Sequence, residues 1–165
     1  MRTILPFTLI VATTLSACST AKPNAVKTNP SPTAPTAVHI DSNVNKQLVA
    51  DFYELAFNRH QPVEAAAKYL APQYIQHNPG APDGAQTFVT FFEGFFQTHP
   101  TAHVQIKRML ADGDLVAVHA RWTQDQTDLG NAVVDIFRIA NGRIVEHWDV
   151  VQPVPEQSFN SNTMF

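Results

Sequence analysis

In the first part of the domain, hydrophobic residues recur at spacings of three and four. This predicts an amphipathic helix that begins at Asp41 or Ser42 and ends near Arg59. The residues predicted to form its buried stripe are Val44, Leu48, Phe52, Leu55 and Ala56. Pro62 suits the first turn of a second, short helix, and Pro72 would end that helix because proline cannot continue it.

A third helix is predicted from about residue 85 to 97, after a short extended piece at 74–77 and the turn-forming segment 78–84. This helix is apolar on most sides, so we expect it to be buried between layers. Its phenylalanines are interpreted mainly as core, with Phe92 also lining a pocket. The five rings are Phe88, Phe91, Phe92, Phe95 and Phe96.

After Pro100 the pattern changes to the period-two alternation of strands. Strands are predicted at 102–110 and 115–123, joined by a turn at Asp112 and Gly113, and a hairpin at 133–152 turns at Asn141 and Gly142. Helices followed by at least four antiparallel strands predict an α+β domain, in which a curved antiparallel sheet wraps around the N-terminal helices as a cone-shaped barrel. A conical cavity would open at one end.

Asp135 is the anomaly of the hairpin, because it lies on one strand face with Val133, Phe137 and Ile139. Burying an unpaired charge is costly, so this carboxylate must be paired, protonated or exposed to a wet cavity. Desolvation favours the protonated acid, which would suit a general acid/base near neutral pH. The alternative is a structural aspartate satisfied by Arg121, His119 or a helix end.

The neighbours of Asp135 depend on the lengths of the turns. A two-residue turn at Asn141 and Gly142 sets Asp135 opposite Trp148, whereas a turn one residue longer sets it opposite His147. In the preceding hairpin His119 is expected opposite Ile106, and it could orient Asp135 or donate to an oxyanion. Trp148 and His147 are thus competing neighbours in one pocket.

His77 and Asn78 are candidates for the polar lip of the same cavity, although an ordinary turn residue beside a partly exposed histidine is the slightly favoured interpretation. His147 and Asp149 lie two apart on one strand and could hold a metal ion. No His-x-His or His-x-x-x-His pair supports them, so no metal site is predicted.

Composition narrows the functional classes. The 165 residues are 44% hydrophobic and 15% charged, which fits one globular domain with an appended segment. The net charge is −3 and the eleven Lys and Arg residues are scattered, so nucleic-acid binding is not expected. Cys18 is the only cysteine, which excludes an intrachain disulfide.

The first twenty residues have the layout of a secretory signal peptide, with Arg2 followed by a short apolar run. Residues 15–18, Leu-Ser-Ala-Cys, resemble the lipobox of bacterial lipoproteins, which implies cleavage after residue 17 and lipid attachment at Cys18. Ser19 in the next position favours outer-membrane anchoring facing the periplasm. Residues 18–40 are rich in Pro, Thr, Ser and Ala and are expected to be a flexible linker, with the domain at 41–165.

The runs YIQHNP, ADGDLVAVH and VVDIFR…NGRIVEHWDVVQP, with the closing MF, resemble the SnoaL-like proteins. These form a polyketide cyclase-like branch of the nuclear transport factor 2 superfamily, and the resemblance covers about residues 44–165. It implies a cystatin-like roll, a homodimer through the open sheet face, and acid/base catalysis without a cofactor. In the cyclases of this family the acid/base aspartate matches Asp135, and a histidine on the preceding strand matches His119.

The sequence therefore predicts an enzyme of the aldol-condensation, cyclase or isomerase type acting on a small hydrophobic carbonyl compound. Asp135 and His119 would be catalytic, and the predicted substrate-binding residues are Trp148, His77, Phe137, His147, Asn78 and Phe92. The alternative is a binding or assembly module of the same fold on the cell envelope, without catalysis. The sequence names neither the ligand nor the reaction.

Overall fold

The computed structural model describes residues 42–165 of the chain. The predicted signal peptide, Cys18 and the linker up to residue 40 lie outside the described residues. Among the described residues, none of the helices is long and apolar enough to cross a membrane.

The first helix has the predicted bounds. Helix α1 (Ser42–Tyr53) continues directly into a π-helical turn, η1 (Glu54–Asn58). The predicted buried stripe is wrong at its start, because Val44 is 61% exposed and the buried positions begin one residue later, at Asn45 and Val49. The Asn45 side chain donates to the carbonyl of Gly113, which ties the start of α1 to a turn of the sheet.

The second and third helices are confirmed as α2 (Pro62–Tyr69) and α3 (Ala85–Thr98). Between them runs β1 (Leu70–Gln76), which is longer than the expected extended piece. It includes a proline and lies at an edge of the sheet, where a residue without an N–H is tolerated.

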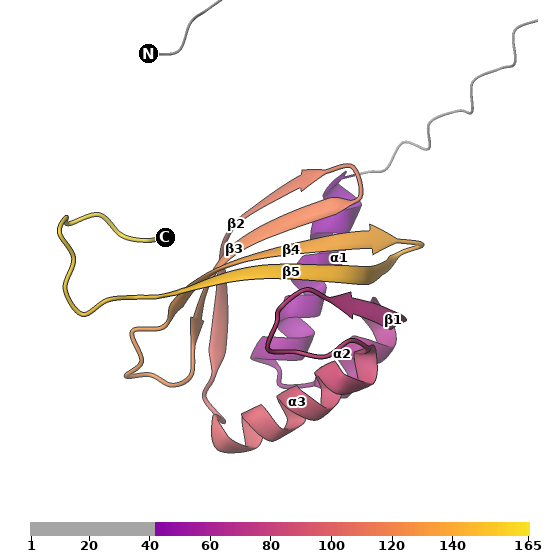
Figure 1. The fold of residues 1–165 in the computed structure, drawn as a ribbon, viewed down its shortest axis with the longest axis horizontal. Helices are drawn as coiled ribbons and strands as arrows, with labels where there is room; N and C mark the ends of the chain where they lie inside the picture. The colour runs from indigo at the N-terminus through magenta and orange to yellow at the C-terminus, as the bar shows by residue number, and fades with distance from the viewer. Residues whose placement is uncertain (1–41) are drawn as a thin grey trace, which may run out of the picture. The chain divides into compact units, whose positions relative to one another are not determined.

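The prediction that α3 is buried between layers is wrong. Only Val89 and Phe96 of this helix are buried, and Phe91 is 62% exposed. The helix lies on the outside of the molecule beside α2 (Figure 1). One side of it packs inward, and the other side is mostly polar, with Phe91 as its exposed large apolar residue.

The remaining strands are β2 (His103–Asp112), β3 (Leu115–Thr123), β4 (Asn131–Ala140) and β5 (Arg143–Pro153). They form one five-stranded sheet in the order β1-β5-β4-β3-β2, in which β1 is parallel to β5 and the other neighbours are antiparallel. The predicted antiparallel barrel is therefore an open, mixed sheet. Figure 1 shows the sheet curving across α1, with α2 and α3 beyond its β1 edge.

The β4–β5 turn has the predicted two residues, since Ala140 pairs with Arg143. Asn141 and Gly142 have φ values of 53° and 70°, the left-handed pair that a type I′ turn requires and that Asn-Gly adopts readily. Gly130, just before β4, has φ 84°, and a Cβ there would lie 2.5 Å from the carbonyl oxygen of Trp122. Only glycine fits this close approach.

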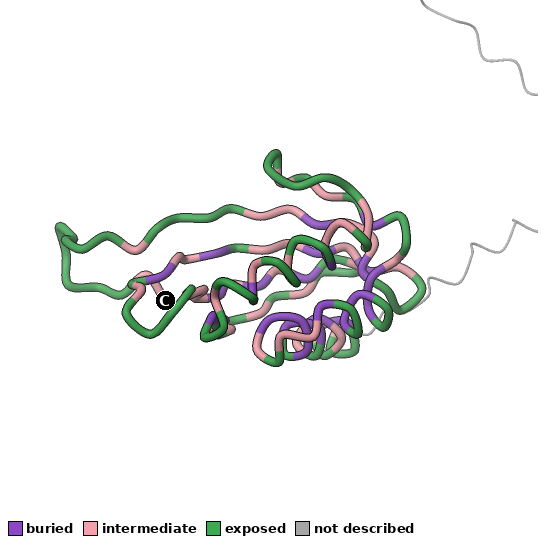
Figure 2. The backbone as a smooth tube through the Cα atoms, turned by 90° about the horizontal axis from the view of Figure 1, so that it is seen from below, coloured by how far each residue is buried: buried purple, intermediate pink, exposed green. Residues whose placement is uncertain are grey.

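The core lies between the helices and one face of the sheet. We call this face, which carries Val116, Val118 and Phe137, the inner face, and the opposite one, which carries His119 and Val134, the outer face. Val116 and Val118 are fully buried, and burying a side chain of this kind stabilises the fold by about 1.5–3 kcal/mol. Figure 2 shows the buried segments gathering where helices and sheet meet, whereas the chain after β5 is mostly exposed.

Candidate functional site

Asp135 lies on the inner face, in the middle of β4. It pairs with Val118 of β3 on one side and with Asp149 of β5 on the other. Because paired residues share a face, two carboxylates meet directly across the β4–β5 ladder on the side of the sheet that also carries the buried residues Val118 and Phe137. An acidic pair in such a place needs donors.

A bulge in β5 decides which of the competing neighbours reaches Asp135. Arg138 pairs with Glu146 and Ile139 with Ile144, so Val145 is the extra residue. From there on, the register differs by one from the regular ladder predicted from the turn. Phe137 therefore lies opposite His147 instead of Glu146. The predicted pairing of Asp135 with Trp148 is wrong, and His147 is the residue that shares its face.

Asp135 is bound by one side chain on each of its oxygens. His147 Nε2 lies 2.8 Å from Oδ1, and the Tyr53 hydroxyl donates to Oδ2. The side chains of Asp135 and His147 are 14% and 11% exposed, and Tyr53 is almost fully buried. Burial, and then the adjacent Asp135, raise the pKa of Tyr53 well above its ordinary value, so Tyr53 stays protonated and acts as a donor.

The end of β1 supplies two further polar side chains to the inner face. Gln76 Oε1 lies 2.9 Å from His147 Nδ1, and Asn78 Nδ2 donates to both oxygens of Asp149, at 2.9 and 2.7 Å. The register explains their arrival, because Gln76 pairs with His147 in the parallel β1–β5 ladder. Asn78, predicted at the polar lip of a cavity, lies against Asp149, the residue that pairs with Asp135.

Aromatic rings enclose this hydrogen-bonded chain. The Phe137 ring stacks on His147 with centroids 4.8 Å apart, and the Tyr74 ring is nearly parallel to it at 6.3 Å. Burial, and then the charges of Asp135 and Asp149, raise the pKa of Tyr74 far above its ordinary value. Phe137, predicted to shape the site, does contact it.

His77 and Trp148 lie on the outer face, so their predicted contact with the site is wrong. Their rings stack with centroids 4.5 Å apart, and His77 Nε2 lies 2.8 Å from Glu146 Oε1. Arg138 also donates to Glu146. Trp148 lies on the outer face because of the bulge in β5. His77 lies there because side chains alternate along an extended chain, so that Gln76 points inward and His77, the next residue, points outward.

His119 also lies on the outer face. It pairs with Val134 of β4 on one side and with Arg108 of β2 on the other. The β2–β3 turn consists of Gly113 and Asp114 instead of the predicted Asp112 and Gly113, and a bulge follows in β2. The expected pairing with Ile106 is therefore wrong. His119 stacks near the ring of Phe165, on the far side of the sheet from Asp135, so it cannot assist that carboxylate directly.

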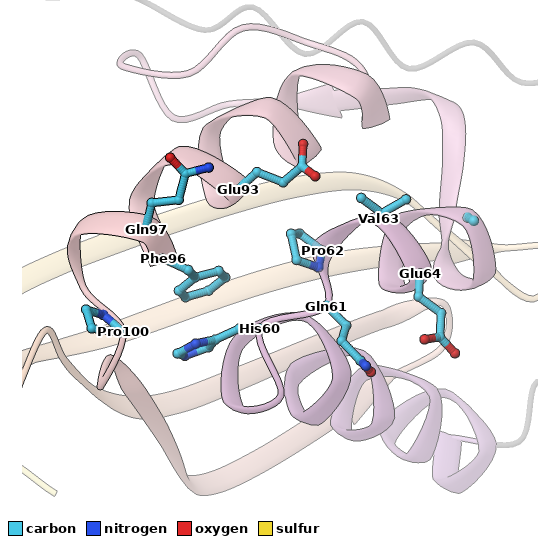
Figure 3. Close-up of a pocket in the computed structure, with 10 residues that line it drawn as sticks. His60, Gln61, Pro62, Val63, Glu64, Glu93, Phe96, Gln97 and Pro100 are labelled. Carbon is cyan, nitrogen blue, oxygen red and sulfur yellow. The ribbon is translucent and has the colours of Figure 1, made fainter.

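The interior beside α3 is filled with aromatic side chains. Phe92 contacts the rings of Phe57, Phe88 and Trp122 and is half-buried. Neither of the two best-defined hollows of residues 42–165 is lined by Asp135 or His147. The larger, of about 580 Å³, lies between α2 and α3 and includes His60, Glu64, Glu93 and Phe96, as Figure 3 shows. The predicted conical cavity in front of Asp135 is not one of these hollows.

Three of the inner-face side chains could in principle share a metal ion. Asp135, His147 and Asp149 each present one ligand atom within 4.8 Å of the others. In the structure these three side chains are hydrogen-bonded: His147 Nε2 faces Asp135, and Asp149 accepts from Asn78. The arrangement as it stands is suited to holding and moving a proton.

Three participants were not predicted from the sequence: Tyr53, Tyr74 and Gln76. The alternation of strands offered a signal for two of them, because Tyr74, Gln76 and Asn78 share one face of β1 and the segment that follows it. Tyr53 gave no such signal. It directly precedes the π-helical turn, next to Phe52, and both residues are buried.

These features define an open α+β roll with a carboxylate and a histidine on the helix-covered face of its sheet. The model of the SnoaL-like domain family matches residues 49–147, more than half of the chain, and the protein belongs to this family. A search of curated proteins gives no match.

Solved structures agree on the fold. A proposed polyketide cyclase from Acidithiobacillus ferrooxidans is 19% identical, with a TM-score of 0.58 over 70% of this chain and 91% of that one. A proposed ketosteroid isomerase from Kribbella flavida is 20% identical, with a TM-score of 0.58 over 73% and 86%. A proposed SnoaL-like polyketide cyclase from a Jannaschia species is 20% identical, with a TM-score of 0.56 over 72% and 90%. The predicted SnoaL-like α+β fold is confirmed.

Proposed function

We propose that this protein is an acid–base enzyme of the cyclase or isomerase type that acts, without a cofactor, on a small hydrophobic carbonyl compound. The observation that carries the proposal is the position of Asp135. Its carboxylate lies on the helix-covered face of the sheet, bound by Tyr53 and His147, and 14% of the side chain stays exposed to solvent. Relatives of the same fold include proteins described as cyclases and as a ketosteroid isomerase.

In the proposed reaction Asp135 removes a proton from a carbon next to a carbonyl group. The C–H bonding electrons move toward the carbonyl oxygen and form an enolate, and the proton stays on the Asp135–His147 pair. In an isomerisation the same proton returns to another carbon. In a cyclisation the enolate carbon attacks a second carbonyl, a carbon–carbon bond forms, and the oxygen of that carbonyl takes the proton from the pair. The Tyr74 hydroxyl, kept protonated by its raised pKa, offers a neutral donor for the developing oxyanion.

One observation favours a second candidate, a module that binds a small apolar ligand without catalysis. The two hollows of residues 42–165 described above are not lined by Asp135, so a ligand held in the larger one, between α2 and α3, would not meet the acid–base pair. The test uses a small ketone.

The test is the isomerisation of cyclohex-3-en-1-one to its conjugated isomer, followed by ultraviolet absorbance. The Asp135→Asn variant should bind the conjugated product as wild type does, in ligand-observed NMR, but lose turnover by about 10²- to 10⁴-fold, the usual contribution of a general acid/base. Glu146→Gln on the outer face is the matched control and should keep turnover within about threefold. A wild-type protein that binds the ketone but is no faster than Asp135→Asn would support the binding module and contradict the enzyme.

We also propose that the protein is a lipoprotein of the outer membrane, anchored through Cys18 and facing the periplasm. The support is the lipobox-like segment at residues 15–18 and the proline-rich stretch after it. Cys18→Ala should release the protein from the membrane fraction, and a variant that stays membrane-bound would contradict the anchor.

The proposed oligomer is a homodimer formed through the outer face of the sheet. Exposed apolar side chains support it: Val134 and Val150 pair across the β4–β5 ladder and are 40% and 70% exposed. Val150→Asp should convert the dimer to a monomer in analytical ultracentrifugation. A wild-type protein that sediments as a monomer would contradict the proposal.

A further inference from the structure

The amide of Gln76 has only one possible orientation. Its Oε1 atom lies 3.0 Å from the backbone N–H of Asn78, which can only donate, so the atom at that position must be the acceptor oxygen. The amide nitrogen points the other way, toward the Tyr74 hydroxyl at 3.4 Å.

The backbone around Gln76 is held on both sides. Its own N–H donates to Asp83 Oδ1 at 2.7 Å, and the next N–H, that of His77, donates to the carbonyl of His147 at 2.9 Å. The amide oxygen is therefore fixed in front of the His147 ring, 2.9 Å from Nδ1. Because that oxygen can only accept, Nδ1 of His147 must carry a hydrogen.

The other ring nitrogen of His147, Nε2, is then the one that can exchange a proton with Asp135. Nε2 of His147 lies 2.8 Å from Asp135 Oδ1, while Tyr53 donates to Oδ2. With Nδ1 protonated, Nε2 either accepts a proton from the carboxylic acid or, once protonated, donates it to the carboxylate. One proton can move along this line without any heavy atom changing place.

We propose that Gln76 is a positioning residue that fixes His147 with its hydrogen on Nδ1, so that Nε2 exchanges one proton with Asp135. The step is balanced when it starts from the pair without its shared proton: the proton that Asp135 takes from the substrate carbon forms an O–H bond, passes to Nε2 as an N–H bond, and returns by the same path. The consequence for catalysis rests on the proposed function, but the position of the hydrogen does not.

The experiment is an NMR pH titration of the histidine ring nitrogens, with histidine labelled by the heavy nitrogen isotope and His147 assigned from its loss in His147→Gln. Across the range in which wild type is folded, Nδ1 of His147 should keep the shift of a protonated nitrogen, and only Nε2 should titrate. In Gln76→Met, which has a similar length but no acceptor, Nδ1 should lose its hydrogen at high pH. Gln76→Glu, which keeps an acceptor oxygen, should restore the wild-type pattern.

Gln86→Met, an exposed substitution of the same kind on α3, is the control and should change nothing. An unprotonated Nδ1 in folded wild type, or a Gln76→Met protein that keeps its Nδ1 hydrogen, would overturn the proposal. With the ketone, Gln76→Met should lower kcat by about tenfold with little change in KM, as expected when a positioned proton transfer is impaired. If wild type shows the expected NMR pattern but no turnover, the acid–base function fails and the role of Gln76 stands.

Discussion

Two histidine–carboxylate pairs lie on opposite faces of the same hairpin, with the same separation and different surroundings. On the inner face His147 Nε2 lies 2.8 Å from Asp135, and on the outer face His77 Nε2 lies 2.8 Å from Glu146. The histidine side chain is 11% exposed in the first pair and 40% in the second. Distance alone therefore does not distinguish them.

The difference lies in the third partner of each carboxylate. Arg138 Nε donates to Glu146 at 2.6 Å, and hydrogen bonds from His77 and Arg138 lower the pKa of Glu146, so this carboxylate stays ionised. Asp135 receives a neutral tyrosine hydroxyl instead of a cation. A permanent cation fixes the charge of the outer pair, whereas the inner pair has only the proton that its two members share. This contrast is why we place proton transfer on the inner face.

The largest expected difference between the two pairs is the loss of folding stability when the third partner of each carboxylate, Tyr53 or Arg138, is removed. Tyr53→Phe leaves a mostly buried carboxylate oxygen without its donor and should reduce the free energy of unfolding by about 1–3 kcal/mol. Arg138→Met removes a partly exposed ion pair, which solvent screens, and should reduce the free energy of unfolding clearly less. Urea unfolding at neutral pH measures both, and equal losses would contradict the contrast between the two faces.

A smaller effect on the free energy of unfolding is expected at alkaline pH, and it arises only from the inner face. Burial and neighbouring carboxylates raise the pKa of Tyr74 above its ordinary value of 10.0, so the folded state keeps a proton that the unfolded state loses. The corresponding stability is complete below about pH 10 and falls as the pH rises, by about 1.4 kcal/mol per pH unit for one group. Tyr74→Phe should make this fall shallower, whereas Glu146→Gln should leave it unchanged. The free energy of unfolding measured from pH 9 to 11 decides between these outcomes.

Local sequence patterns predicted the elements well. Helical spacing located α3 to within a residue at each end. The strand predicted at 115–123 has the same bounds as β3. Asn141-Gly142 predicted a two-residue turn, which the structure has. These features depend on residues close together in the chain. The inner-face position of Asp135 among Val133 and Phe137 follows from the same alternation.

The partners of Asp135 could not be predicted in this way. Val145, the bulged residue, has no local signature, yet it brings His147 to the inner face and leaves Trp148 on the outer face. The one-residue displacement of the turn at Gly113 likewise changed the partner of His119. Tyr53 reaches Asp135 only because α1 packs across the sheet, a contact between residues 82 apart in the sequence. Register and packing over such separations decide the site.

The smallest expected effect is a loss of folding stability at acid pH, and it arises from Glu146 on the outer face. Hydrogen bonds from His77 and Arg138 lower the pKa of Glu146 in the folded state, so the unfolded state takes up a proton first as the pH falls. The stability from this group is therefore present above the ordinary carboxyl pKa and lost as the pH falls through the lowered one. Glu146→Gln should flatten that acid loss in urea unfolding between about pH 5 and 3, whereas Tyr74→Phe, the matched inner-face variant, should leave it as in wild type. An acid loss of the same steepness in Glu146→Gln would mean that solvent screens the outer pair completely, and that its short distances contribute nothing to the stability of the hairpin.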